Sequence, residues 1–217
     1  MIDRFNRWAA AAGMLAAPFY LTLIITLGAM EPGFSHRTSL MSMLGGVTGV
    51  RGLAFNLGVA VTGVMVIAFM IGLQRSLPSK WTAKVGSVLL LISGLGLIGA
   101  GIFHCNQDCR NILADPNVVG RLHLISSLFA GMGTGLALFF FWAAMRGSGK
   151  WRGFVTPTLV VAVLANVPGI VLWFTIFANL RLHAVEGLIQ RVGIIVVLIW
   201  IFFVAARLER ASGWEKQ

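Results

Sequence analysis

Four histidines and two cysteines are the side chains of this sequence best suited to chemistry. They are His36, His104, His123, His183, Cys105 and Cys109. Neutral histidine binds metal ions and moves protons near neutral pH, whereas cysteine forms disulfides or binds soft metals. All six lie in or beside short polar segments that separate long apolar runs. The sequence therefore places its reactive groups at the ends of those runs.

Polar residues recur with helical spacing after two of the histidines. His123 is followed by serines three and four residues later, so the three side chains share one helix face. A second polar stripe consists of His183, Glu186, Gly187, Gln190 and Arg191. A charge placed as far into an apolar run as Arg191 is costly in lipid. We therefore expect Arg191 to face the interior of a helix bundle and to have a partner there.

The stretch PGFSHRTSLMSMLGG, residues 32–46, adds further polar groups after the first apolar run. More polar groups lie near the start of the second and fourth runs and in FHCNQDC, residues 103–109. If the ends of the runs meet, these groups line one pocket beneath residues 32–46. The predicted pocket residues are His36, Ser39, Ser42, Asn56, Asp108, Arg121, His123, His183, Glu186, Gln190 and Arg191.

The elements that would hold this pocket are membrane-spanning helices. Hydrophobic residues make up 58% of the 217 residues and charged residues 11%, whereas soluble domains carry about 25% charged residues. A helix needs about 20 apolar residues to cross a bilayer. The sequence has six such runs, at 8–30, 51–74, 85–104, 119–145, 155–179 and 184–206. We predict an all-α integral membrane bundle of six transmembrane helices that forms a single domain over residues 1–217.

The basic residues indicate how the bundle is oriented. Eleven of the 17 Lys and Arg residues fall on the side of the two termini, against three acidic residues. Because positive loops stay in the cytoplasm, both termini are predicted to be cytoplasmic in the cell (plasma) membrane, with the pocket facing outward. The formal net charge of +10 does not indicate nucleic-acid binding, because the basic residues are scattered and form no basic block.

The two cysteines are separated by three residues. Cys105 and Cys109 match neither the redox Cys-x-x-Cys pattern nor a zinc pair of pairs. On the outer side a small structural disulfide between them is the favoured interpretation. A pair of thiols and a pair of metal ligands are the alternatives.

Three kinds of function remain open at this stage, and the sequence does not decide whether the chain is an enzyme. The favoured hypothesis is a pocket for a small polar or lipid-headgroup ligand, with arginines binding an anion. The second is a metal-dependent, membrane-embedded lipid hydrolase or transferase with zinc held by His36, Asp108, His123 and His183. The third is a structural or assembly partner of another membrane protein, or a homo-oligomer. Membrane lipids are the expected partners, and no cofactor is required by the residues.

The sequence resembles a prokaryotic integral-membrane family, domain of unknown function 998. The resemblance rests on the order of several pieces: AGMLAAPFY, PGFSHRTSLMSMLGG, AFNLG, IFHCNQDC, GRLH and EGLIQR. The positions that match the family pattern are Ser42, Leu44, Gly45, Asn56, Asp108, Cys109, His123, Gly187 and Arg191. The resemblance implies a helical membrane fold and leaves the activity open.

Overall fold

The structure, a computed structural model, describes residues 2–105, 117–178, 180 and 184–213. Every regular element in these residues is helical. The long helices are α1 (Ile2–Met30), α2 (Val50–Ser76), α3 (Trp81–Ile102), α4 (Val118–Met145), α5 (Val155–Phe177) and α6 (Glu186–Gly213). Two short 3-10 helices are η1 (Met41–Gly46) and η3 (Gly149–Phe154).

Six of the described helices are long and apolar enough to cross a membrane. Their bounds follow the apolar runs closely, as in α4, which was predicted at 119–145. This helix begins where the side-chain oxygen of Asn117 accepts a hydrogen bond from the backbone nitrogen of Val119, at 3.0 Å. Such a cap satisfies one of the backbone donors that a helix start leaves unpaired. The predicted all-α chain with six potential spans is confirmed.

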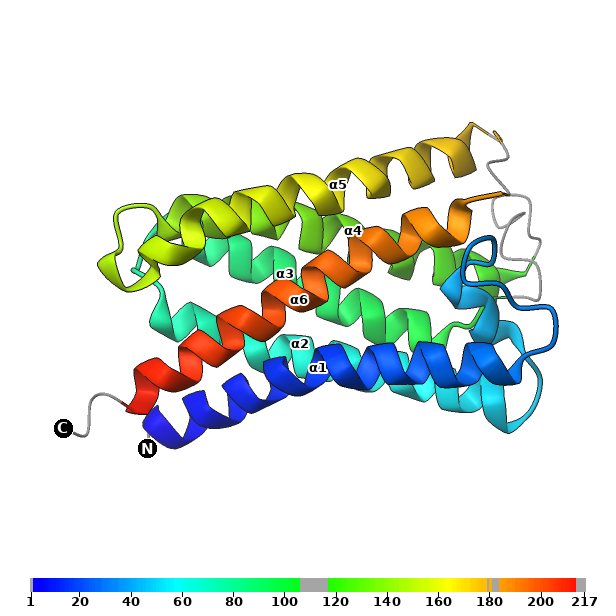
Figure 1. The fold of residues 1–217 in the computed structure, drawn as a ribbon, viewed down its shortest axis with the longest axis horizontal. Coiled ribbons are helices and arrows are strands. Elements are labelled where there is room, and N and C mark those ends of the chain that lie inside the picture. The colour runs from blue at the N-terminus through cyan, green and yellow to red at the C-terminus, as the bar shows by residue number, and fades with distance from the viewer. Residues whose placement is uncertain (1, 106–116, 179, 181–183, 214–217) are drawn as a thin grey trace.

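The six helices form a closed ring in sequence order. Each helix packs against the next, and α6 returns to pack against α1. Both termini lie at the same end of the bundle (Figure 1). We call this the proximal end, and we call the opposite end, where α1 stops and α6 starts, the distal end.

Small residues let α3 pack closely on both of its neighbours. A Cβ atom added at Gly96 would lie 2.6 Å from the backbone nitrogen of Ala130 on α4. A Cβ atom at Gly63 on α2 would lie 2.6 Å from the carbonyl oxygen of Gly94 on α3. Glycines at these crossings therefore allow backbone-to-backbone contact, as small residues do in membrane bundles.

The proximal half of the ring is filled by large side chains. Trp200 stacks on Phe141 with ring centroids 6.0 Å apart and meets Phe69 edge to face at 6.2 Å. Its indole nitrogen donates a hydrogen bond to the hydroxyl of Thr158 on α5, at 2.8 Å. The proximal part of α5 is therefore anchored to this core.

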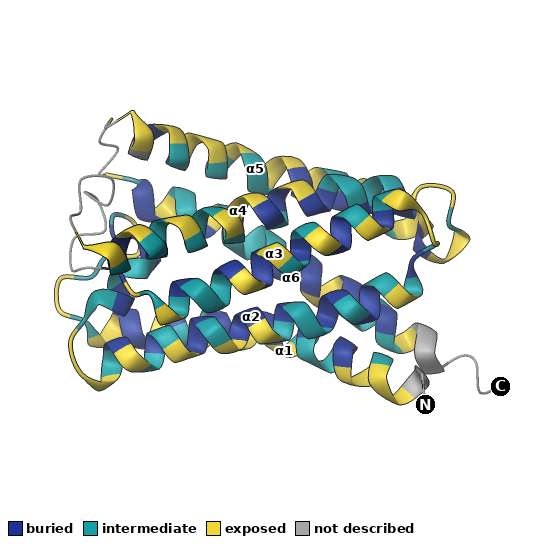
Figure 2. Ribbon diagram, turned by 180° about the vertical axis from the view of Figure 1, so that it is seen from behind, coloured by how far each residue is buried: buried dark blue, intermediate teal, exposed yellow. Residues whose placement is uncertain are grey.

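α5 as a whole is packed more loosely than the other helices. α5 is the least buried of the six potential spans, and exposed residues follow its length (Figure 2). Pro168 interrupts its hydrogen bonding, because proline lacks a backbone N–H. A Cβ atom added at the next residue, Gly169, would meet nothing within 4 Å. The ring is therefore tight at α3 and looser along α5, where the position of Gly169 adjoins open space.

Candidate functional site

A cavity of about 510 Å³ occupies the distal half of the ring. All six helices and η1 contribute to its wall. Most of the lining is apolar, with Phe55 and Val59 on α2, Leu97 on α3 and Ile194 on α6 among the described residues. Ligand sites of this volume, mostly apolar with a few polar groups, are common in proteins.

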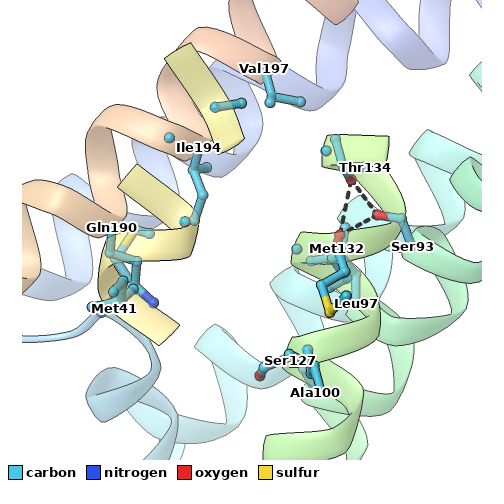
Figure 3. A pocket seen from close by; sticks show the side chains of 18 of the residues that line it. Met41, Ser93, Leu97, Ala100, Ser127, Met132, Thr134, Gln190, Ile194 and Val197 are labelled. Atoms are coloured by element: carbon cyan, nitrogen blue, oxygen red, sulfur yellow. Dashed lines mark hydrogen bonds between the residues drawn. The ribbon is translucent and has the colours of Figure 1, made fainter. Parts of the chain in front are cut away.

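Gln190 on α6 is the polar group best placed to meet a ligand. Its side-chain oxygen accepts a hydrogen bond of 2.7 Å from the backbone nitrogen of Met41 in η1. Because that bond fixes the oxygen, the amide nitrogen is directed into the cavity, toward α4 (Figure 3). Two N–H donors therefore face the cavity from this side.

His123 and Ser127 lie on the α4 side of the cavity. The Nδ1 atom of His123 is 2.7 Å from the carbonyl oxygen of Phe103, at the end of α3, and 3.3 Å from that of Ala100. Since a carbonyl only accepts, Nδ1 carries a proton and donates it. The Nε2 atom is then left to accept from the hydroxyl of Ser127, which is 3.3 Å away. His123 thus caps the end of α3 and presents Ser127 to the cavity.

The cavity opens at the surface between α4 and α5. Met132, Ile170 and Phe174 line it and are nevertheless 51%, 66% and 62% exposed. Gly131 belongs to the same lining, and a Cβ atom there would approach only the Trp173 ring nitrogen, at 3.6 Å. The exposed side of this opening is apolar, as a surface that faces lipid should be.

Arg191 does not line this cavity, although it lies one residue from Gln190. Its Nη1 atom donates to the carbonyl oxygens of Ser39, at 2.9 Å, and Gly187, at 2.7 Å. Its Nε atom donates to Nδ1 of His36 at 3.2 Å, and its guanidinium lies 5.5 Å from the centroid of the Phe34 ring. Among the described residues, Nη2 has no hydrogen-bond partner and no carboxylate pairs with this arginine.

These contacts fasten residues 34–41 to the start of α6. The backbone nitrogen of Leu188 also donates to the carbonyl oxygen of Arg37, at 3.0 Å. A Cβ atom at Gly187 would lie 2.5 Å from the carbonyl oxygen of Ser39, so glycine is required for this approach. The contacts set the position of Met41 and Ser42 in the cavity wall.

His36 is neutral in this arrangement, because Nδ1 must accept a hydrogen bond from Arg191. Partial burial of the ring, and then the positive charge of Arg191, hold the pKa of His36 below its ordinary value. A second, smaller pocket borders this contact between α1 and α6, lined by aliphatic side chains with His36 and Arg191 at its edge.

The structure divides the predicted pocket residues into separate groups. Ser42, His123 and Gln190 line the cavity. His36 and the buried Ser39 join Arg191 on the α1 side of α6. The remaining described members lie elsewhere: the Asn56 side chain donates to the carbonyl oxygen of Gly45, at 3.0 Å, Arg121 is exposed, and Glu186 is buried at the start of α6.

Several predictions fall on residues that the structure does not describe. Asp108, Cys109 and His183 lie outside the described residues, so the Cys105–Cys109 disulfide and a zinc site that uses Asp108 or His183 remain predictions. Within the described part of the chain, no group of three His, Cys, Asp or Glu side chains could hold a metal ion. His36 and His123 are engaged with different partners, Arg191 and Phe103.

Most of the cavity wall was missed by reading the sequence. Tyr20, Trp173 and Asn166 line it together with several glycines, and none of them was among the predicted pocket residues. Asn166 lies two residues before Pro168 and donates to the carbonyl oxygen of Gly135 on α4, at 3.0 Å. A polar residue beside a helix-internal proline was a sign in the sequence that a polar group lies within the bundle here, but it did not identify α4 as the neighbour.

Comparison with known proteins identifies the family and nothing finer. No curated protein and no solved structure shows a significant match to this chain. One family profile, described as "Protein of unknown function (DUF998)", matches residues 14–207. The matched residues include all the described residues that line the cavity, from Tyr20 on α1 to Ile201 on α6. The chain belongs to the DUF998 family.

Proposed function

We propose that this protein binds a membrane lipid in its distal cavity and admits it sideways, between α4 and α5. The observation that carries the proposal is a cavity of about 510 Å³ that is lined by apolar side chains and opens between exposed apolar residues. A ligand that enters there can keep its hydrocarbon in the bilayer while its polar end reaches Gln190 and Ser127. This refines the expected lipid-headgroup pocket, because the wall offers hydrocarbon surface as well as polar groups.

The entrance can be tested with a photoactivatable lipid. A trace of lipid with a diazirine near the end of its chain would be reconstituted with the protein in phosphatidylcholine nanodiscs. After irradiation, we expect adducts on Phe55 and Leu198, which line the cavity and are 4% and 5% exposed. Adducts confined to outward side chains such as Leu53 and Leu57, which are both 58% exposed, would contradict the proposal.

Blocking the opening gives the matched control. Gly131→Trp fills the entrance with a large side chain and is expected to abolish the internal adducts. Ile125→Trp adds the same bulk on α4 at a position that is 47% exposed and outside the cavity lining, so the adducts should persist. Equal labelling of both variants would count against entry between α4 and α5.

We also propose that the proximal end faces the cytoplasm and that the membrane is the plasma membrane. The support is the surplus of Lys and Arg at the proximal end, including Arg75, Lys80, Arg146 and Arg207. Single cysteines in the α2–α3 connection and in residues 47–49 would be tested with a membrane-impermeant maleimide on intact cells. Labelling of the α2–α3 connection alone would reverse this orientation.

A further inference from the structure

We infer that the ligand of the distal cavity is an uncharged lipid whose polar end carries a hydroxyl or carbonyl oxygen. The inference rests on the proposed function and names the class of ligand for the same site. None of the described residues in the cavity lining is Asp, Glu, Lys or Arg. A charged headgroup in this largely apolar wall would lose its hydration without gaining an opposite charge from the described lining, which is strongly unfavourable.

Among the described residues, the arginine next to Gln190 in the sequence makes its hydrogen bonds outside the cavity. Arg191 is 8% exposed, lies outside the cavity lining and donates to two backbone carbonyls and to His36. Arg121 on α4 is exposed and also lies outside the lining. A phosphate or carboxylate bound beside Gln190 would therefore pair with neither of these two described arginines unless the start of α6 rearranged.

The hydrogen-bonding groups that do face the cavity suit a neutral oxygen. The amide nitrogen of Gln190 offers N–H donors from α6, because its oxygen is held by Met41. On the opposite wall, the hydroxyl of Ser127 donates to Nε2 of His123 and keeps lone pairs that can accept. An alcohol or a glycerol hydroxyl can accept from Gln190 and donate to Ser127, and a carbonyl can make the first of these bonds.

The volume limits how much of the lipid is enclosed. A cavity of about 510 Å³ lies within the range of sites that hold drug-sized ligands. That is enough for a small polar end and part of one hydrocarbon chain. The rest of the chain, or a second chain, must leave between Met132 and Phe174, at the opening that faces lipid.

Probes that share one hydrocarbon chain separate this inference from the proposed function. The full chain, purified in detergent, would be mixed with oleyl alcohol or with oleate at mildly alkaline pH and examined by native mass spectrometry and thermal unfolding. We expect oleyl alcohol to form an adduct and stabilise the protein, and oleate to bind at least tenfold more weakly. Dioleoylglycerol and decyl-ubiquinone then distinguish an acylglycerol from a quinone as the source of the oxygen.

Substitutions locate the bound oxygen. Gln190→Leu and Ser127→Ala should each weaken oleyl alcohol binding about threefold to tenfold, the loss of one hydrogen bond. Gln74→Leu makes the same exchange at a glutamine outside the cavity lining, where it accepts from Ser87, and should leave binding unchanged. Ser127→Ala leaves the hydrogen bond between Gln190 and Met41 in place, so it tests the inference even if Gln190→Leu lowers stability.

The possible results separate a failure of the inference from a failure of the proposed function. If oleate binds as tightly as oleyl alcohol and Gly131→Trp blocks both, the cavity binds lipid and the uncharged class is wrong. If Gln190→Leu and Ser127→Ala both bind oleyl alcohol as the wild type does, the assigned polar end is wrong. If no probe binds to the wild type, the proposed function fails and the inference fails with it.

Discussion

The contrast between a tight α3 and a loose α5 predicts opposite effects for one substitution at two glycines. In Gly96→Ala, the new Cβ would lie 2.6 Å from both the backbone nitrogen of Ala130 and the carbonyl oxygen of Ser126. Carbon atoms prefer separations of about 3.5–4.0 Å, so α3 and α4 must separate by roughly 1 Å. In Gly169→Ala, the new Cβ meets nothing within 4 Å.

Helix propensity and packing set the difference in unfolding free energy between the two variants. Both substitutions gain about 1 kcal/mol of helix propensity, which cancels when the two variants are compared. Overpacking of a close contact costs about 1–3 kcal/mol, and it applies to Gly96→Ala alone. We therefore expect Gly96→Ala to be less stable than Gly169→Ala by about 1–3 kcal/mol.

Unfolding by SDS in mixed micelles, followed by circular dichroism, measures this free-energy difference directly. The wild type should lie between the two variants, or close to Gly96→Ala if the helix gain offsets part of the clash. Equal stabilities, or a less stable Gly169→Ala, would refute the packing contrast from which the opening between α4 and α5 was argued.

Three further outcomes follow from the contacts at the distal end and beside α5. The stabilisation that depends on neutral His36 should be fully present above the ordinary histidine pKa of about 6.5. It should be lost as the pH falls from there through the lower folded-state pKa of His36, because a protonated ring cannot accept the hydrogen bond from Arg191. Thermal unfolding measured against pH should show this loss for the wild type and less of it for His36→Gln. Gly187→Ala should cost about 1–3 kcal/mol in unfolding titrations, because its Cβ would lie 2.5 Å from a carbonyl oxygen. Asn166→Leu should cost about 0.6–1.7 kcal/mol in the same titrations, since it removes a hydrogen bond between α4 and α5.

The spans could be predicted because hydrophobicity acts over whole segments and needs no knowledge of neighbours. The largest differences between the predicted and observed bounds lie at the charged, proximal ends of helices. α1 and α3 start earlier than predicted, at Ile2 and Trp81, because Arg4, Arg7 and Lys84 continue the helix beyond its apolar part. Hydropathy locates the segment that prefers lipid, whereas the helix extends until its backbone finds another way to satisfy its hydrogen bonds.

The pocket was predictable only in part, because spacing gives the depth and face of a residue but not its partner. Asn56 and Arg191 donate hydrogen bonds to backbone carbonyls of residues 39–45 and of the start of α6, and neither lines the cavity. His123 is held by the end of α3. The cavity lies beside α5, the least buried of the six potential spans, and an open space between helices leaves no periodic pattern in a sequence.

Arg191 lies beside the cavity without lining it, and its contacts hold the neighbouring wall in place. A buried cation is costly without a partner. Within the described part of the chain no carboxylate pairs with Arg191, and carbonyl dipoles, a neutral histidine and the face of Phe34 surround it instead. The planar fork of arginine reaches these groups in different directions, which the single ammonium of lysine cannot do. By fixing Ser39, it sets the adjoining η1, from which Met41 orients Gln190. The charge thus shapes the wall of a neutral cavity, and Arg191→Lys should loosen Gln190 and weaken ligand binding without placing any new charge in the site.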